Sequence, residues 1–275
     1  MSHFVCPVCG KPLERQEKVY LCENLHSFDI SKKGYVNLLL SSSSGKVHGD
    51  DKAMVSARAE FLAQGFYDDL SGYIAALAET YCPNGGVILD AGCGEGKYTS
   101  DIAAALKRSG KCAEVVGVDI SKDAVNLAAG RDKTCRFAVA SAAKLPMAED
   151  STDVMISIFA PFFAEEFLRV LKDDGVIIRA YPLARHLWEL KELVYDTPYE
   201  NPETDMEEEG FEIAGRHELR YKIMIERYED IKNLFVMTPY FYRTSEEDTE
   251  KLSHIDKLGL SLEFGIVVYK KKPRA

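Results

Sequence analysis

The first 26 residues contain four side chains with the types and spacing of a metal site. Cys6, Cys9, Cys22 and His26 follow the pattern C-x2-C-x12-C-x3-H. Thiolates and imidazoles are the ligands that Zn²⁺ takes in structural sites, and two such pairs can close a tetrahedron around the ion. Four protein ligands leave no open position to activate water. The predicted zinc is therefore structural, and it stabilises a segment that is too small to bury a core of its own.

Two other interpretations of these cysteines are weaker. A redox C-x-x-C needs a βαβ setting, which the sequence around Cys6 lacks, and the cysteines could also merely pack. The odd total of seven cysteines favours metal binding over disulfides. Residues 1–10 lack the basic start and apolar run of a secretion signal, and no segment has the roughly 18 apolar residues of a membrane span. We expect a cytoplasmic protein with no membrane partner.

A second group of chemically significant residues surrounds a glycine-rich turn. Residues 87–99, Val-Ile-Leu-Asp-Ala-Gly-Cys-Gly-Glu-Gly-Lys-Tyr-Thr, have the pattern of a strand, a tight turn and a helix. Glycine has no Cβ, so a ligand can approach the backbone of this turn closely. The next strand ends at Asp119, where a carboxylate can accept hydrogen bonds from both ribose hydroxyls of an adenosine. These two features in register predict an adenosine-containing cofactor.

Carboxylates in the turn indicate which cofactor it is. Asp90 precedes the glycines and Glu95 lies among them, so the turn would repel a pyrophosphate. The cationic aminoacyl end of S-adenosylmethionine fits instead, and residues 86–181 resemble the class I methyltransferase family. Ser141 replaces the acidic residue expected four positions before Leu145-Pro146, so adenine recognition would use the backbone near Ala142. The predicted cofactor contacts are Asp90, Gly92, Gly94, Gly96, Tyr98, Thr99, Asp119, Ile120, Ala142 and His186.

The elements that must position these residues follow an alternating pattern. Five short apolar runs separated by amphipathic segments are typical of the buried strands of a doubly wound parallel sheet. Residues near 211–226 and 262–269 can supply two more strands, and helices are expected near 51–64, 67–81, 228–236 and 245–258. The fold class is therefore α/β, a seven-stranded Rossmann-like domain preceded by the zinc module. The five runs are Val87–Ala91, Glu114–Asp119, Arg136–Ala140, Asp153–Phe159 and Val176–Tyr181.

The likeness to a more specific family extends over nearly the whole chain. The first 40 residues include Phe28-Asp29 and Lys33-Gly34-Tyr35-Val36-Asn37-Leu38-Leu39 after the metal ligands. Ala160-Pro161, Arg185-His186-Leu187-Trp188-Glu189-Leu190-Lys191 and Met237-Thr238-Pro239 follow in the larger part. With these motifs the chain resembles the 23S ribosomal RNA guanine N1-methyltransferases. The resemblance implies a homodimer that methylates a guanine in a stem-loop of large-subunit RNA, which the zinc module helps to hold, and no DNA partner.

On this basis we expect three segments. Residues 1–40 form the zinc-binding RNA-recognition module, residues 41–50 a linker that includes Ser41–Gly45, and residues 51–275 the methyltransferase domain. The net charge of −10 does not exclude RNA, because residues 1–50 carry a net charge of +1. Residues 196–212 contain eight acidic and no basic side chains, as in a solvated loop.

The acceptor base is expected at the carboxyl ends of the fourth and fifth strands, near Phe159, Ala160, Pro161, Tyr181, Arg185 and His186. Because the sulfonium methyl is already activated, the enzyme mainly has to position the acceptor nitrogen. Guanine N1 lies on the pairing edge, so the base must be unpaired or flipped. Phe159 is a candidate for stacking on it, and His186 and Glu189 are the catalytic candidates for accepting the proton; His186 could equally be a helix cap or a packing residue.

Two rival functions remain. One is a small-molecule methyltransferase whose zinc module serves folding or dimerisation, which the acidic net charge favours. The other is a non-catalytic RNA-binding scaffold, which an intact glycine turn and Asp119 disfavour. Ile158-Phe159-Ala160-Pro161 offers no side-chain acceptor, so the amino groups of adenine and cytosine are disfavoured targets.

Overall fold

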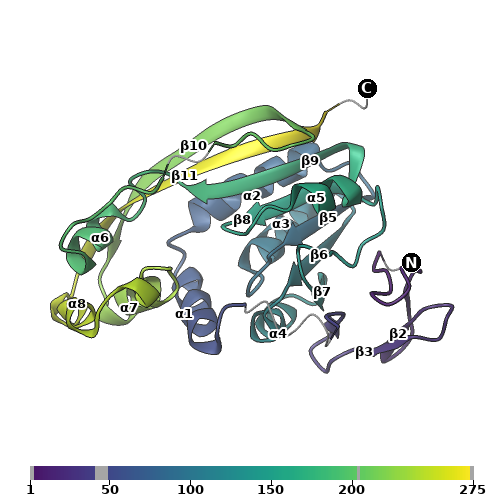
Figure 1. The fold of residues 1–275 in the computed structure, drawn as a ribbon, viewed down its shortest axis with the longest axis horizontal. Helices are drawn as coiled ribbons and strands as arrows, with labels where there is room; N and C mark the ends of the chain where they lie inside the picture. The colour runs from purple at the N-terminus through teal and green to yellow at the C-terminus, as the bar shows by residue number, and fades with distance from the viewer. Residues whose placement is uncertain (1–2, 41–48, 203–204, 273–275) are drawn as a thin grey trace.

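An eight-stranded sheet runs through the molecule in a computed structural model that describes residues 3–40, 49–202 and 205–272 (Figure 1). The strand order is β10-β11-β9-β8-β5-β6-β7-β4. Seven of the strands are β5 (Gly86–Ala91), β6 (Ala113–Asp119), β7 (Arg136–Val139), β8 (Thr152–Ile158), β9 (Leu171–Pro182), β10 (Phe211–Ile225) and β11 (Leu258–Lys271). The predicted class I methyltransferase sheet is therefore confirmed.

The eighth strand, β4 (Val36–Asn37), comes from the N-terminal segment. It pairs in parallel with β7, with Val36 opposite Ala138 and Asn37 opposite Val139. This strand is not predictable from the sequence, because two residues carry no periodicity of their own. The last residues of the predicted zinc module thus belong to the large sheet. The predicted linker residues 41–48 lie outside the described residues, and the domain boundaries stay a prediction.

The order of the parallel strands creates the ligand-binding edge. From β5 the chain moves outward through β6 to β7, and then returns to pair β8 with the other side of β5. In such doubly wound sheets, ligands bind at the carboxyl ends of the strands where the order reverses. The long antiparallel pair β10 and β11 extends the sheet on the far side of β9.

Helices cover the two faces unequally. One face packs against α2 (Asp68–Tyr81), α3 (Lys97–Ser109) and α4 (Lys122–Arg131). The opposite face carries α5 (Ala164–Val170), and residues 140–151, all of which the structure describes, contain no helix between β7 and β8. The N-terminal segment covers this part of the sheet instead. Most of its buried side chains share one cluster with β6 and β7, among them Phe4, Leu13, Val36 and Leu38.

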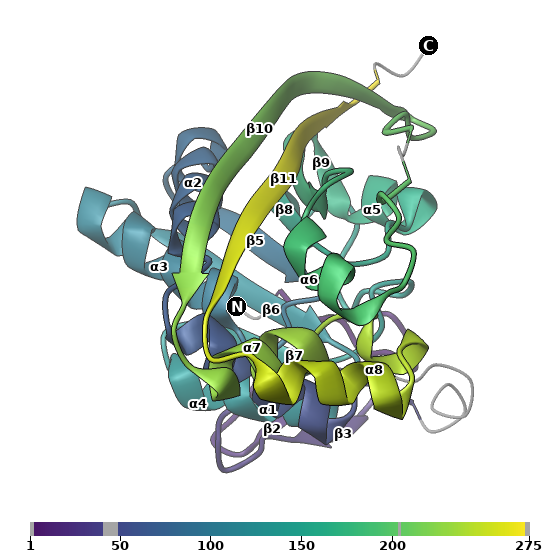
Figure 2. The same ribbon diagram turned by 90° about the vertical axis from the view of Figure 1, so that its left-hand side faces the viewer.

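A helical lobe lies at the end of the molecule opposite the N-terminal strands β2 (Val19–Leu21) and β3 (Ser27–Asp29) (Figures 1 and 2). Its elements are α6 (Trp188–Val194), α7 (Tyr228–Val236), η2 (Phe241–Arg243), α8 (Glu246–Lys251) and η3 (Leu252–His254), and α1 (Lys52–Ala63) packs against α7. The helix predicted over 245–258 ends earlier, because β11 already begins at Leu258. Among the described residues, no helix is long and apolar enough to cross a membrane.

The acidic segment 196–212 is not simply a solvated loop. Met206 is buried, and its carbonyl accepts a hydrogen bond from the Tyr269 hydroxyl at 2.8 Å. Phe211 is also buried and begins β10. The prediction of a solvated loop was wrong for Met206 and Phe211, because the many acidic residues around them dominate the composition of the segment.

Candidate metal centre and cofactor site

Two tight turns bring the four N-terminal ligand residues together. In the first turn, the Gly10 N–H donates to the Cys6 carbonyl at 2.8 Å, and Gly10 has a φ of 72°. In the second, the Cys22 N–H donates to the His26 carbonyl at 3.1 Å. Strands β1 (Glu14–Arg15), β2 (Val19–Leu21) and β3 (Ser27–Asp29) form a small antiparallel sheet that joins the two turns. Each turn therefore contributes one pair of ligands.

The distances between the ligand atoms fit a tetrahedral zinc ion. One ligand atom from each of Cys6, Cys9, Cys22 and His26 lies within 4.8 Å of all the others. Sγ of Cys9 and Sγ of Cys22 are 3.7 Å apart, and Nδ1 of His26 is 3.4 Å from Sγ of Cys22. Zinc bond lengths imply tetrahedron edges of about 3.8 Å for two sulfurs and about 3.6 Å for sulfur and nitrogen. The donor set and its spacing thus fit the predicted ion.

The local backbone also favours the metal-binding form of one thiol. The backbone N–H of Lys11 is the main cause that lowers the pKa of Cys9 to about 6. Metals bind the thiolate rather than the thiol. His3, the other histidine near the first turn, pairs with Glu114 at 3.2 Å and is not part of this cluster.

The glycine turn between β5 and α3 has the close approaches that exclude side chains. Gly92 has a φ of 94°, and a Cβ there would lie 2.8 Å from Cβ of Ala160. Gly96 has a φ of 82°, and a Cβ there would lie 2.7 Å from Cβ of Ala128. Only glycine fits both the backbone conformation and the space. Gly92 and Gly94 are half-buried, whereas Gly96 is buried, so part of the turn's backbone is accessible at the carboxyl end of β5.

Asp119 holds this turn against the tip of β6. Its carboxylate accepts the Gly94 N–H at 2.9 Å and the Ser121 N–H at 2.8 Å. Burial raises the pKa of this carboxyl group. Asp119 thus orders the turn at the same edge where it is predicted to meet ribose hydroxyls. Ile120, the next predicted contact, packs against Gly49.

The other two carboxyl groups of the turn lie beneath it. Asp90 accepts a hydrogen bond from the Thr99 hydroxyl at 2.6 Å, and burial raises its pKa to about 7. Glu95 pairs with Arg131 at 3.2 Å, and burial raises the pKa of Glu95. Thr99 is fully buried, and its hydroxyl positions Asp90. Its role as a direct cofactor contact stays a prediction.

Two further predicted cofactor contacts occupy different places. Tyr98 is buried in the first turn of α3, and Cys93 is buried in the glycine turn as a packing residue. Ala142 lies half-buried in the β7–β8 connection, where the Ser141 hydroxyl accepts the Ala143 N–H. The roles of Tyr98 and Ala142 stay predictions.

Phe159 marks the expected acceptor side of the site. It follows β8, has a φ of 52° and is 46% exposed, with its ring 5.8 Å from that of Phe264. A bulky residue with a positive φ is strained, and such strain concentrates at functional sites. Of the other predicted wall residues, Ala160 lies against Gly92 and His186 packs on the same Phe264 ring, whereas Arg185 stacks on Trp188.

The two predicted proton acceptors are engaged by protein partners in this structure. His186 is 5% exposed, its Nδ1 accepts the Glu263 N–H at 3.1 Å, and its Nε2 lies 3.4 Å from the Tyr67 hydroxyl. Glu189 accepts hydrogen bonds from the amide and the hydroxyl of Ser261 with its two carboxylate oxygens. Their roles as proton acceptors stay predictions. The predicted contact between His186 and the cofactor stays a prediction.

His186 is expected not to titrate near neutral pH. Burial is the main cause that lowers its pKa to about 3, because the charged imidazolium would lose its hydration. In an NMR titration from pH 5 to pH 8, the ring signals assigned through a His186→Gln variant should stay constant. A titration midpoint between pH 6 and pH 7 would contradict the buried neutral ring.

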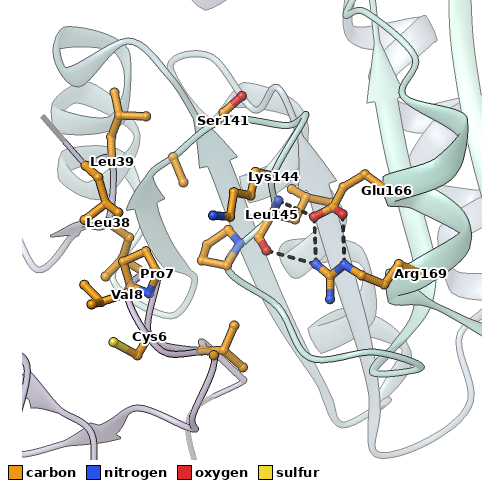
Figure 3. A pocket seen from close by; sticks show the side chains of 15 residues that line it. Cys6, Pro7, Val8, Leu38, Leu39, Ser141, Lys144, Leu145, Glu166 and Arg169 are labelled. Atoms are coloured by element: carbon orange, nitrogen blue, oxygen red, sulfur yellow. Dashed lines mark hydrogen bonds and ion pairs between the residues drawn. The ribbon is translucent and has the colours of Figure 1, made fainter. Parts of the chain in front are cut away.

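A cleft separates the first metal turn from the β7–β8 connection (Figure 3). Its volume is about 380 Å³, and its walls are mostly apolar side chains such as Val8, Leu38 and Pro146. Glu166 and Arg169 hold the backbone of Leu145 in one wall, since Glu166 accepts the Leu145 N–H and Arg169 donates to the Leu145 carbonyl. Lys144 is exposed at this cleft. This cleft is not predictable from the sequence, because its walls come from distant segments.

Comparisons with known proteins agree with this arrangement. The family described as "RlmA, N-terminal" matches residues 4–41, and the family described as "Methyltransferase domain" matches residues 83–233. A Micromonospora griseorubida protein provisionally named 23S rRNA (guanine-N(1)-)-methyltransferase is 33% identical over 89% of this chain and 88% of its own length. YxjB of Bacillus subtilis (strain 168), with the same provisional name, is 30% identical over 97% of this chain and 96% of its own.

A third relative carries a more specific name. The 23S rRNA (guanine(748)-N(1))-methyltransferase of Streptomyces fradiae is 32% identical over 69% of this chain and 67% of its own length. The sheet, the glycine turn and the cysteine cluster define the protein as a class I S-adenosylmethionine-dependent methyltransferase preceded by a zinc ribbon. The chain belongs to the 23S rRNA guanine-N1-methyltransferase family.

Proposed function

We propose that the protein transfers the methyl group of S-adenosylmethionine to N1 of a guanine in a stem-loop of 23S ribosomal RNA. The observation that carries this proposal is the likeness to YxjB, which spans 97% of this chain and therefore both the zinc ribbon and the methyltransferase domain. A relative that shared only the methyltransferase domain would not favour any substrate. The combination of both parts favours the RNA named in these relatives.

The cofactor fits the edge formed by the glycine turn and Asp119. Bound there, S-adenosylmethionine supplies an electrophilic methyl group. The chain's own contribution is placement: the open backbone at Gly92 and Gly94 admits the cofactor, and Asp119 is the acceptor for its ribose. The acidic groups Asp90 and Glu95 favour a cationic ligand, because opposite charges attract strongly in a buried site. Zn²⁺ at Cys6, Cys9, Cys22 and His26 would be structural.

The acceptor base would meet Phe159. Its exposed ring at the end of β8 can stack on a guanine that has left its helix, and stacking contributes about 1–3 kcal/mol per base. The exposed cations Lys18, Lys32 and Lys144 are the candidates for phosphate contacts near the zinc ribbon. Their positive charges would attract RNA phosphates locally, although the whole chain has a net charge of −10.

Methyl transfer to RNA is expected to require the guanine and Asp119. Labelled S-adenosylmethionine would be supplied with the stem-loop that contains guanine 748, the base named in the Streptomyces fradiae relative, and with the guanine-to-adenine RNA. Label should enter only the guanine RNA, and reverse transcription should stop at the product because an N1 methyl blocks the pairing edge. An Asp119→Ala enzyme should lose transfer by about 100-fold or more.

The small-molecule alternative predicts a different outcome. Binding to RNA through phosphates weakens steeply with salt, by about 0.9 log units per contact for each tenfold rise. An RNA affinity that does not depend on salt, together with clear cofactor binding and no label in any ribosomal RNA, would overturn the proposal. The acidic net charge is the observation that favours this alternative.

A further inference from the structure

Residues 49–50 and Arg58 close over the glycine turn from the side of α1. A guanidinium nitrogen of Arg58 lies 3.9 Å from the position of a Cβ on Gly94. Arg58 forms a short ion pair with Asp50, whose backbone carbonyl accepts the Ser121 hydroxyl at 3.2 Å. A Cβ on Gly49 would lie 2.9 Å from the Ile120 side chain. This segment therefore touches both the glycine turn and the tip of β6.

Arg58 differs from the other charged groups around the turn in what it faces. Asp90, Glu95 and Asp119 are held by Thr99, Arg131 and two backbone amides, respectively. Arg58 attracts both Glu95 and Asp119, and it lowers the pKa of each against the larger opposing effect of burial. Arg131 is already bound to Glu95 beneath the turn. Arg58 is thus the cation that faces the open backbone of Gly94.

S-adenosylmethionine brings one carboxylate to this place. The carboxyl groups of the turn suit its ammonium and sulfonium, but they repel its carboxylate. A guanidinium binds carboxylates with paired, charge-assisted hydrogen bonds. Arg58 has a side chain that is 26% exposed and a partner, Asp50, that is itself a carboxylate. The present ion pair shows that its guanidinium can hold such a group here.

We propose that Arg58 binds the carboxylate of the cofactor's aminoacyl group, and that Asp50 holds the guanidinium in place until the cofactor arrives. The inference rests on the proposed location of the cofactor at the glycine turn and is independent of the RNA substrate. Arg58 exchanges one carboxylate partner for another, so the empty site carries no unpaired guanidinium. Neither residue is predictable from the sequence, because a single arginine in a helix carries no motif.

The test compares the binding of two cofactors that differ only in this carboxylate. Dissociation constants for S-adenosylmethionine and its decarboxylated form would be measured by calorimetry, without RNA. The Arg58→Met variant should bind S-adenosylmethionine about 10- to 100-fold more weakly than the wild type, as expected for the loss of a charged hydrogen-bonded pair. Its affinity for the decarboxylated form should not fall. Lys52→Met, which removes the same charge from an exposed position of α1, should change neither.

The role of Asp50 has its own discriminating outcome. Asp50→Asn removes the competing charge, so this variant should bind S-adenosylmethionine at least as tightly as the wild type. Equal weakening of both cofactor forms by Arg58→Met and Asp50→Asn would overturn the inference and leave only a structural ion pair. Asp119→Ala tests the location of the cofactor separately. It should weaken the binding of both cofactor forms, whether or not Arg58 binds the carboxylate. If it changes neither, the location is wrong and this inference falls with it.

Discussion

Loss of zinc is expected to destabilise the whole chain and not only its N-terminal segment. Cys6 and Cys22 are buried, and Phe4, Leu13, Val36 and Leu38 between and beside the ligands share a core cluster with β6 and β7. The Leu38 N–H also donates to the Val139 carbonyl at 2.9 Å. If the two turns that carry the zinc ligands open, these N-terminal side chains no longer cover this face of the large sheet.

The size of the effect follows from the energies of zinc sites. Structural Zn²⁺ contributes roughly 10–16 kcal/mol to small zinc modules, whereas a whole domain is stable by about 5–15 kcal/mol. Losing one ligand through Cys22→Ala should therefore cost several kcal/mol. For a chain of this size that corresponds to a fall in melting temperature of about 10 °C.

Trp188 makes the test specific. It is the only tryptophan in the chain and begins α6, in the helical lobe opposite the zinc ribbon. Thermal unfolding followed by Trp188 fluorescence should shift to lower temperature in Cys22→Ala or with a chelator. Cys112→Ala, which alters an exposed cysteine outside the cluster, is the matched control. An unchanged Trp188 transition, with the ribbon cysteines newly reactive, would show that the ribbon unfolds independently.

Local patterns carried most of what the sequence could predict. The zinc ligands occur as pairs separated by two and three residues, so each turn brings its own pair together. The glycine turn likewise links Gly92 and Gly96 to a strand and a helix that are contiguous in the chain. The strands were predicted from runs of apolar residues, and β5 (Gly86–Ala91) differs from its predicted range by one residue.

The features that the sequence did not predict depend on partners far along the chain. The surroundings of His186 are one example, because Tyr67 and Glu263 come from distant segments and engage its ring. The two residues of β4 become a strand only because β7 offers a free edge. Arg58 acquires its position from the glycine turn, which is 36 residues away at Gly94. No pattern within a short window contains such information.

Asp90→Asn is expected to stabilise the folded protein at pH 8 and to weaken the binding of the cofactor. Asp90 is 1% exposed, and its pKa is raised from 3.8 to about 7, first by burial and then by the charges of Asp119 and Glu95. Between these two pH values the folded chain holds a proton that the unfolded chain has lost. The contribution of this group to stability is therefore fully present below pH 3.8 and falls as the pH rises to about 7.

The raised pKa corresponds to a cost of roughly 4 kcal/mol above pH 7, as an upper bound. An asparagine avoids this cost and can still accept the hydrogen bond from Thr99. The melting temperature of Asp90→Asn should thus exceed that of the wild type at pH 8, and the difference should vanish near pH 4. Glu149→Gln, an exposed carboxyl-to-amide change, should show no such gain. A variant that is less stable than the wild type at pH 8 would contradict a costly buried carboxylate.

The same substitution should reduce the affinity for S-adenosylmethionine by about 10- to 100-fold at pH 7.5, because the cofactor's positive charges lose a carboxylate beneath the glycine turn. In the wild type this affinity should rise between pH 5.5 and pH 7.5 as Asp90 ionises, whereas in Asp90→Asn the rise should be absent. Calorimetric titrations of both proteins across this range would measure it. A stable variant with unchanged affinity would mean that Asp90 serves folding alone. If the prediction holds, the ionised Asp90 destabilises the fold and at the same time attracts the cationic cofactor. This opposition between stability and binding explains why a carboxyl group that weakens the fold occupies this position.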